Sequence, residues 1–400
     1  RGFELNFKYI CDTDLNRDRG LKIDKSILTN DWQKVINDKE VDIVIELVGG
    51  VDLPYKIING AISNGKHVVT ANKAVLAKKG EELFKQASDN ERQIGFEASV
   101  AGGIPIIRVI KDALVSNKIK AIYGIINGTT NYILTKMIYE KMPFIDALKK
   151  AQELGFAEAD PTLDISGGDA ASKIAILASL AFNTSVDLEK VFVSGIDGLD
   201  LRDVEYAISM GYTVKLLAIA ASDDNGSIEV RVHPCLISSD HSIASVKNEF
   251  NAVLIDADYL GYSMYYGKGA GAFPTATAVV SDIVDIAEHI TSEASYSQFK
   301  TKPHEKRRIK DIRELKSRYY IRINSDDKPG VLAKVAGIFA SRQISIAEVH
   351  QKETHGDIVH VVIITHDAIE KDFIDCVEQI DKLPEIKKQS IFIRLVDFGV

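Results

Sequence analysis

The chain has 400 residues, of which 46% are hydrophobic and 26% are charged. This length exceeds one typical core, so we expect two or three domains in a protein of ordinary globular composition. The formal net charge of −8 argues against nucleic acid or an anionic membrane surface as the main partner, because both favour a positive protein face.

The three cysteines, Cys11, Cys235 and Cys376, lie far apart in the sequence. Their spacing fits neither a disulfide framework nor a zinc site and favours a reducing compartment, so we expect a cytoplasmic protein. No apolar run approaches the ~18 residues that a membrane helix needs. Because the chain starts with Arg1 and not with Met, we also expect that its natural start lies upstream.

Short β-rich runs alternate with helical stretches in the first hundred residues. The expected strands are KYICDTD, VDIVIELVGG, KHVVTANK and RQIGFEASVAGG, and the expected helices are LPYKIINGAISNG and KKGEELFKQASDN. This alternation predicts a doubly wound parallel sheet, in which ligands bind beyond the carboxyl ends of the strands. The residues at those ends are Asp12, Gly49, Gly50, Asn72, Lys73, Glu97 and Gly102.

A dinucleotide-binding sheet normally opens with a strand, a glycine-rich turn and a helix, and no such turn precedes Asp12. We therefore expect a truncated Rossmann-like domain at residues 1–107 that lacks its first βα unit. Asp12 ends a strand at a place that suits a ribose-binding acid.

Residues 108–300 mix helices and strands in an α+β pattern and are expected to form a catalytic and dimerisation domain. Long helices are predicted at DISGGDAASKIAILASLAFN and RDVEYAISMGYTVKLLAIAA, and strands at IEVRVHPCLI and NAVLIDA. The run GKGAGAFPTATAVVSDIVDIAEHI reads as a glycine-rich loop before a long amphipathic helix that packs back on the nucleotide domain. Residues 301–317 read as a charged linker.

The last segment, residues 318–400, has a β-α-β-β-α-β order, which predicts a ferredoxin-like sandwich. Pro329 is expected to open its first helix.

Asp169 and Lys173 carry the most specific chemical signal, in the stretch GFAEADPTLDISGGDAASK. Four residues apart on a helix, they share one face, about 5–6 Å apart at Cβ. They could form a surface ion pair worth about 0.3–0.5 kcal/mol. The following run IAILASLAF is apolar all round, however, which favours burial, and a buried lysine beside a carboxylate can donate a proton.

The other acids of this stretch have two readings. Asp160 and Asp164 suit a turn and a helix cap, whereas Glu158 is better explained by a cationic substrate group such as an α-ammonium. Lys73 follows a strand end, where it either contacts a cofactor or is simply solvated. The small residues after Glu97 and the Asn-Gly turn before Thr129 are weak signals alone.

Together, TANKA, FEASVAGGIPII, GIINGTTNYIL, LGFAEADPTLDISGGDAASK and GKGAGAFPTATAV resemble homoserine dehydrogenase, in the same order, from about residue 40 to 295. The run DDKPGVLAKVAGIFA is similar to an ACT domain, as found in the longer bacterial form of that enzyme. Phe156 departs from the pattern, because the family often has Tyr there.

The resemblance implies NAD(P)H-dependent reversible reduction of L-aspartate 4-semialdehyde to L-homoserine, in the biosynthesis of threonine, methionine and isoleucine. It makes Lys173 the proton donor and acceptor with Asp169 beside it, and places Lys73 between nicotinamide and substrate. The substrate contacts that it implies are Glu158, Asp164, Asp169, Thr129 and Gly128. The cofactor contacts are Lys73, Gly155, Gly271, Asp12 and Arg17.

The resemblance further implies a sodium ion held largely by backbone carbonyls at Glu97, Val100, Gly102 and Ile104, since oxygen ligands suit a hard cation. Asp12 suits NAD, whereas Arg17 and Arg19 suit the 2′-phosphate of NADP, and the balance favours NADP slightly.

The ACT-like unit implies feedback control by L-threonine, the end product of the pathway. Asp327, Gly330 and Val331 are the candidate effector contacts, because backbone N–H groups at a helix start bind a carboxylate. The alternative is a dimerisation module without a ligand. A homodimer or homotetramer is expected.

Two other functions are compatible with an ACT-like unit. A 2-hydroxyacid dehydrogenase requires a histidine that acts as the acid and is paired with a carboxylate. None of the nine histidines lies in a motif of that kind. A non-catalytic amino-acid sensor, an enzyme remnant that kept its ACT unit, stays open if the natural chain also starts at Arg1.

Overall fold

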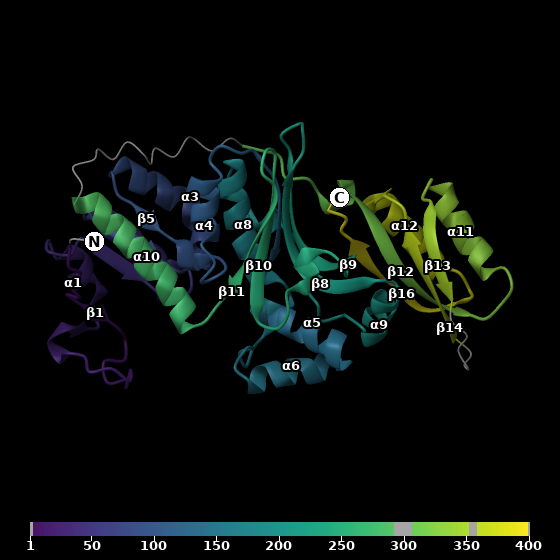
Figure 1. Cartoon of the computed structure of the whole chain (residues 1–400), viewed down its shortest axis with the longest axis horizontal. Helices are drawn as coiled ribbons and strands as arrows, with labels where there is room; N and C mark the ends of the chain where they lie inside the picture. The colour runs from purple at the N-terminus through teal and green to yellow at the C-terminus, as the bar shows by residue number, and fades with distance from the viewer. Residues whose placement is uncertain (1–2, 292–305, 352–357, 399–400) are drawn as a thin grey trace. The chain divides into compact units, whose positions relative to one another are not determined.

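The computed structural model describes residues 3–291, 306–351 and 358–398 (Figure 1). The chain divides into two compact units, which are described separately: residues 1–118, 175–188 and 267–306 form the first, and residues 119–174, 189–266 and 307–400 form the second. Residues 301–305 of the predicted linker lie outside the described part of the chain. Within the described ranges, no helix combines the length and the hydropathy that a bilayer crossing requires.

The first unit contains the parallel sheet that the alternating pattern predicted. β3 (Ile43–Glu46), β4 (His67–Thr70) and β5 (Ile94–Gly95) pair in parallel in this order. β1 (Ile10–Cys11) and β2 (Leu28–Thr29) form a separate parallel pair. All four strands are shorter than the predicted runs. The difference is largest for KYICDTD, which contributes only β1, and for RQIGFEASVAGG, which contributes only β5 before the chain turns into a 3-10 helix.

Helices connect these strands and cover them. Among the described residues of this unit, the helical segments are η1 (Lys25–Ile27), α1 (Trp32–Asn37), α2 (Asp52–Ser63), α3 (Lys73–Asp89), η2 (Glu97–Ser99), α4 (Ile106–Arg108), η3 (Val109–Ala113) and α10 (Ala272–Thr291). Val279, Ile283 and Ile286 of α10 form one apolar cluster with Val69 of β4. The amphipathic helix predicted from the sequence thus packs on the parallel sheet.

The second unit is built on one mixed sheet. Its strands follow the order β11 (Gly261–Lys268), β10 (Phe250–Ala257), β6 (Ile119–Ile125), β8 (Tyr212–Ser222), β9 (Ile228–Ser238), β16 (Ile386–Leu395), β12 (Lys316–Asp326), β14 (Ile358–Thr365) and β13 (Ile346–Gln351). β7 (Phe192–Val193) pairs with β9, and β15 (Ala368–Ile369) pairs with β12. β11 begins in this unit and ends in the other.

The predicted long helix at RDVEYAISMGYTVKLLAIAA is wrong in its second half. α9 (Leu201–Ser209) ends before Gly211, which has a φ of +82°, and β8 begins at Tyr212. β8 is buried along most of its length, so it reads as a continuous apolar run. Periodicity alone cannot distinguish such a run from a buried helix.

The predicted helix at DISGGDAASKIAILASLAFN is also divided. α7 (Thr162–Ile165) ends at a turn in which Gly167 has a φ of +88°, and α8 (Gly168–Phe182) follows. Further helical segments that the structure describes before the C-terminal domain are α5 (Gly128–Glu140), α6 (Phe144–Glu153), η4 (Leu188–Lys190) and η5 (Ser242–Ser245).

The C-terminal β-α-β-β-α-β order is confirmed by β12, α11 (Val331–Ser341), β13, β14, α12 (Glu370–Asp381) and β16. α11 and α12 share one apolar core with β12, which includes Phe339, Phe373 and Ile321. The predicted helix start at Pro329 is wrong, because Gly330, with a φ of +93°, is the N-cap and α11 begins at Val331. The short η7 (Ile312–Glu314) precedes β12.

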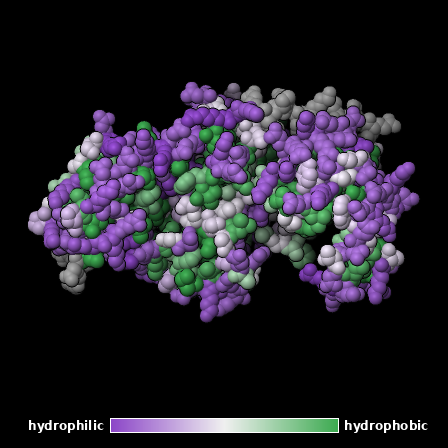
Figure 2. All heavy atoms as spheres, turned by 180° about the vertical axis from the view of Figure 1, so that it is seen from behind, coloured by the Kyte–Doolittle hydropathy of each residue, from purple (hydrophilic) through white to green (hydrophobic). Residues whose placement is uncertain are grey.

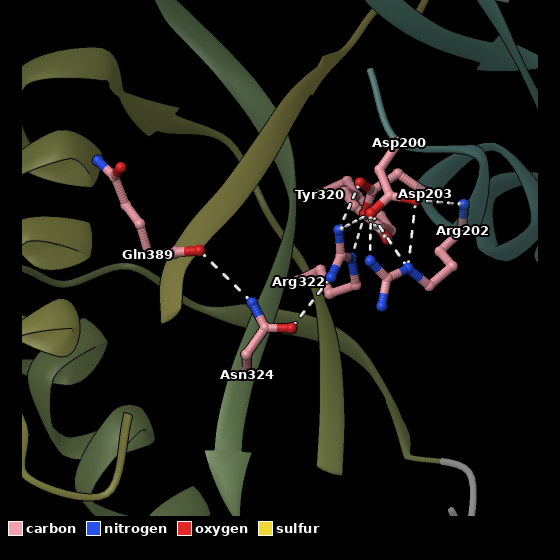
Figure 3. Close-up of polar contacts among 7 residues, drawn as sticks. All are labelled: Asp200, Arg202, Asp203, Tyr320, Arg322, Asn324 and Gln389. Atoms are coloured by element: carbon pink, nitrogen blue, oxygen red, sulfur yellow. Dashed lines mark hydrogen bonds and ion pairs between the residues drawn. The ribbon is translucent and has the colours of Figure 1, made fainter. Parts of the chain in front are cut away.

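Two buried contacts join this C-terminal sheet to the rest of the second unit. Arg394 and Leu395 of β16 pair in parallel with Cys235 and Leu236 of β9. The guanidinium of Arg322 on β12 binds the carboxylate of Asp203 on α9, with the two side chains 2% and 0% exposed (Figure 3). The ACT-like sheet therefore continues the central sheet of its unit.

Figure 2 shows one face of the molecule, where hydrophilic side chains cover most of the surface and hydrophobic ones lie in patches between them. Along the edge strand β11, exposed and half-buried positions alternate, and Tyr262, Met264 and Tyr266 are each more than a third exposed.

Candidate active site

Lys173 and Asp169 form a buried ion pair on the first turns of α8. Lys173 Nζ lies 2.8 Å from Asp169 Oδ2, and the two side chains are 12% and 4% exposed. Lys173 Nζ also donates to the backbone carbonyl of Ile126 at 2.7 Å. This burial rules out the solvated surface ion pair weighed from the sequence.

Asn127 ties this pair to a second carboxylate. Its Nδ2 donates to Asp169 Oδ2 at 2.8 Å and to Asp164 Oδ1 at 2.7 Å. Its Oδ1 accepts from the backbone N–H of Thr130 at 2.8 Å, so Asn127 is also the N-cap of α5. Neither Asn127 nor the Ile126 carbonyl was singled out from the sequence, where Asn127-Gly128 reads only as a turn.

Asp164 is further held by Thr129 at the start of α5. The hydroxyl of Thr129 lies 3.0 Å from Asp164 Oδ2 and 2.6 Å from the carbonyl of Phe156. The Phe156 ring packs on Tyr132, with centroids 4.9 Å apart. Asp164, Asp169, Thr129 and Lys173 are thus brought together in one cluster of polar contacts around Asn127.

The turn between α7 and α8 depends on close backbone packing. Gly195 lies so near this turn that a Cβ atom on it would overlap the carbonyl of Ile165. Ile196 donates its N–H to the same carbonyl at 2.9 Å. This packing fixes the backbone that carries Asp164 and Asp169.

The two remaining acids of the stretch are exposed. Asp160 accepts from the backbone N–H and the hydroxyl of Thr162, at 3.1 and 2.6 Å, which matches its reading as a turn residue. Glu158 is bound through its backbone carbonyl by Gln152 at 3.1 Å, and its carboxylate lies at the surface. Gly155, with a φ of +75°, follows the end of α6 in the same segment.

In the first unit, Lys73 is the first residue of α3 and is half-buried. Asn72 caps this helix by accepting from Ala74 N at 3.1 Å and Val75 N at 3.2 Å. The amide of Asn72 donates to the carbonyl of Gly50 at 2.9 Å. The carboxyl ends of β3 and β4 are therefore tied together, as expected for parallel strands.

Glu97 lies 3% exposed at the start of the predicted sodium loop. Its carboxylate accepts from the backbone N–H groups of Ile107 at 2.8 Å and Arg108 at 3.0 Å. Burial raises the pKa of Glu97 to about 7, although these two hydrogen bonds oppose that shift. Both carboxylate oxygens of Glu97 already accept hydrogen bonds from α4, so a cation in this loop would be bound mainly by backbone carbonyls.

The rest of that loop is tightly wound. Ala101 and Gly102 are consecutive left-handed residues, and a Cβ on Gly102 would lie 2.5 Å from the carbonyl of Gly269. Val100 and Ile104 are buried. In the described ranges, no cluster of three or more His, Cys, Asp or Glu side chains suits a metal ion.

The remaining predicted cofactor residues lie in exposed or glycine-rich segments. Asp12 Oδ2 pairs with Arg19 at 2.7 Å, and this contact lowers the pKa of Asp12. Arg17 presents its carbonyl to Arg19 at 2.9 Å. Gly271, with a φ of +112°, precedes α10.

The candidate effector residues surround the start of α11. Asp327 and Gly330 are exposed, whereas Val331 is buried. Lys334 donates its backbone N–H to Gly330 O at 3.0 Å, which begins the helix.

Comparisons with known proteins agree on one family. Residues 105–284 match the family described as homoserine dehydrogenase, residues 1–97 match the NAD-binding domain of homoserine dehydrogenase, and residues 319–385 match the ACT domain. The homoserine dehydrogenase of Bacillus subtilis (strain 168) is 41% identical over 400 residues, which are 100% of this chain and 92% of that relative.

Solved structures give the same result. A homoserine dehydrogenase from Thiobacillus denitrificans has 42% identity and a TM-score of 0.89, over 93% of this chain and 86% of its own. A hyperthermophilic archaeal homoserine dehydrogenase in complex with NADPH has 31% identity and a TM-score of 0.57, over 66% and 76% of the two chains. The chain therefore belongs to the homoserine dehydrogenase family and is an NAD(P)-dependent oxidoreductase with an ACT domain.

Proposed function

We propose that Lys173 exchanges the proton in the reversible reduction of L-aspartate 4-semialdehyde to L-homoserine. The observation that carries this proposal is the burial of its ammonium group between Asp169 and the Ile126 carbonyl. The reduced nicotinamide supplies the hydride when bound. The chain then has to deliver one proton to the developing alkoxide oxygen, and in the reverse direction Lys173 accepts that proton.

Asp169 and Asp164 support this lysine in different ways. Asp169 is the charged partner that keeps the ammonium group in place and stabilises it in a site largely shielded from water. Asp164 is joined to Asp169 through the Asn127 amide, so the two carboxylates keep a fixed separation.

We assign substrate recognition to Glu158, Gly128 and Thr129. The exposed carboxylate of Glu158 suits the α-ammonium of the amino-acid substrate. Gly128 and Thr129 lie at the start of α5, next to Asp164. In this arrangement Glu158 binds the α-ammonium group of the amino-acid substrate, and the side-chain oxygen of the substrate faces Lys173.

For the cofactor, we propose Lys73, Gly155, Gly271, Asp12 and Arg17 as contacts, with NADP preferred over NAD. The preference is supported by the contact of Asp12 with Arg19, which holds one arginine beside the strand end and next to Arg17. An arginine in that place suits the 2′-phosphate that distinguishes NADP.

We propose that sodium binds at the carbonyls of Glu97, Val100, Gly102 and Ile104. The tight loop and the oxygen-only donor set fit a hard cation. Adding sodium in place of potassium should then raise both activity and thermal stability.

The regulatory part of the proposal is feedback inhibition by L-threonine at Asp327, Gly330 and Val331. We also propose a homodimer or homotetramer, which is supported by the alternately exposed side chains on the edge strand β11. The proposed domains are residues 1–107 for the nucleotide, 108–300 for catalysis and dimerisation, 301–317 as linker and 318–400 for regulation. Free cysteines fit a cytoplasmic enzyme of threonine, methionine and isoleucine biosynthesis.

The proposed reaction is tested by assaying the full-length protein for homoserine oxidation with NADP and NAD, in parallel with Asp169→Asn. The wild type should turn over with both cofactors and faster with NADP, and Asp169→Asn should lose most of its kcat while it still binds the nucleotide. Turnover of Asp169→Asn at the wild-type rate would contradict the assignment. The exposed Asp160→Asn is the matched control and should keep its kcat.

A further inference from the structure

Lys215 is a buried lysine that the proposed reaction does not use. It lies on β8 and is 1% exposed. Its Nζ donates to the backbone carbonyl of Val246 and to Asn131 Oδ1, the latter at 3.1 Å. Both acceptors are uncharged, and burial lowers the pKa of Lys215 to about 8.

A buried lysine of this kind lowers the free energy of unfolding. A buried charge without a carboxylate destabilises a fold, and an apolar side chain of similar length would pack at lower cost. Two ammonium donors at the end of a long apolar stem can nevertheless bring together groups from different elements. The contacts of Lys215 therefore point to a requirement for geometry.

The group that Lys215 meets on α5 is Asn131, which is itself 2% exposed. The amide of Asn131 donates to the carbonyls of Asn248 at 2.9 Å and Phe250 at 3.1 Å. Thr135, one turn further along α5, accepts from the backbone N–H of Asn248 at 2.9 Å. Lys215 and Asn131 thus fasten the segment 246–250 to the first turns of α5.

This segment presses directly on the first residue of α5. A Cβ atom on Gly128 would lie only 2.8 Å from the carbonyl of Glu249. Immediately before Gly128 come the Ile126 carbonyl, which accepts from Lys173, and Asn127, which binds Asp164 and Asp169. The position of the segment therefore sets the position of the groups that hold the proposed proton donor.

We propose that Lys215 and Asn131 are positioning residues, which hold the segment 246–250 against α5 and thereby fix Ile126 and Asn127 around Lys173 and Asp169. This inference rests on the proposed role of Lys173. It explains why a lysine stands in β8, whose other buried residues are almost all apolar.

The test compares Lys215→Met and Asn131→Ala with a matched control, Thr365→Val. Thr365 is fully buried on β14, and its hydroxyl accepts from Tyr319 N at 3.1 Å, so its loss also removes one buried hydrogen bond. Homoserine oxidation is measured well below the melting temperature of each variant. Lys215→Met and Asn131→Ala should each lose at least tenfold in kcat, with the KM for nucleotide changed less than twofold, whereas Thr365→Val should lower only the melting temperature.

Hydrogen exchange gives a second readout, independent of turnover. Amides at residues 126–135 should exchange at least tenfold faster in Lys215→Met and Asn131→Ala, and at the wild-type rate in Thr365→Val. Wild-type kcat and exchange in the two variants would overturn the positioning role. Lys173→Met is measured in parallel. If it keeps the wild-type kcat, the proposed function is wrong, and the positioning role is then judged from the hydrogen-exchange rates alone, which report whether Lys215 holds the segment 246–250.

Discussion

Removing the guanidinium of Arg322 should destabilise the second unit more than any exposed substitution. Arg322 Nε and the terminal nitrogen bind the two oxygens of Asp203 at 2.6 and 2.8 Å, and Tyr320 donates to Asp203 Oδ1 at 2.8 Å (Figure 3). Arg322 also donates to Asn324 Oδ1 at 3.0 Å. In Arg322→Met, the fully buried Asp203 keeps the tyrosine but loses its cation.

Breaking a buried ion pair from one side costs about 3–5 kcal/mol, because the remaining charge stays desolvated. With a urea dependence of about 3 kcal/mol per molar, the unfolding midpoint should fall by about 1–1.7 M. The measurement is urea unfolding followed by circular dichroism, in parallel with Lys316→Met. Lys316 pairs with Asp367 at 3.3 Å with both side chains mostly exposed, so its replacement should leave the midpoint almost unchanged.

A double variant tests whether the lost stability comes from the charge that remains buried on Asp203 or from the loss of an attractive ion pair. Asp203→Leu combined with Arg322→Met removes both charges, and it should regain much of the lost stability because neither group then remains buried alone. A single variant Arg322→Met as stable as Lys316→Met would refute the reasoning. So would a double variant less stable than Arg322→Met.

Three further outcomes are expected from single substitutions. Glu158→Gln should raise the KM for homoserine about tenfold and leave the KM for nucleotide unchanged, because it removes the proposed partner of the substrate ammonium; equal changes in both would contradict this contact. Arg17→Ala should raise the KM for NADP but not for NAD, and a parallel rise in both would remove the 2′-phosphate contact. The lysine at 215 has a folded pKa of about 8, below its ordinary value of 10.5, so between these values the unfolded chain binds more protons and stability rises with pH. Relative to Lys215→Met, the wild type should gain about 1.5 kcal/mol in the free energy of unfolding by urea between pH 8 and 9.5, because the folded lysine is still half protonated at pH 8. A constant difference would contradict the assigned pKa.

The site contacts that could be predicted from the sequence are those whose two residues lie within one helix. Asp169 and Lys173 are one helical turn apart, so their contact follows from helix geometry, and the apolar run after Lys173 indicated its burial. The C-terminal β-α-β-β-α-β order was readable for a similar reason, because each of its strands and helices is a local run with its own periodicity.

Contacts between distant segments were not readable. Asn127 reaches Asp164 and Asp169, which lie 37 and 42 residues further along the chain, and nothing in the local run NGTTNYIL indicates that distance. Lys215 was hidden for the same reason: its two acceptors belong to α5 and to the segment after η5, and its strand was mistaken for helix. Tertiary burial erases the alternation of a half-exposed strand, and it was the cause of the wrong helix prediction at β8.

The central claim is that Lys173 transfers the proton, and single-turnover homoserine oxidation by Lys173→Met tests it most directly. The full-length enzyme is saturated with nucleotide, and formation of the reduced nicotinamide is followed by its absorbance, with the exposed Lys149→Met as control. We expect the hydride-transfer rate of Lys173→Met to fall by about 10²–10⁴-fold, as for loss of a general acid–base group, while nucleotide affinity and the control stay at wild-type values. A rate within threefold of the wild type in Lys173→Met would contradict the account.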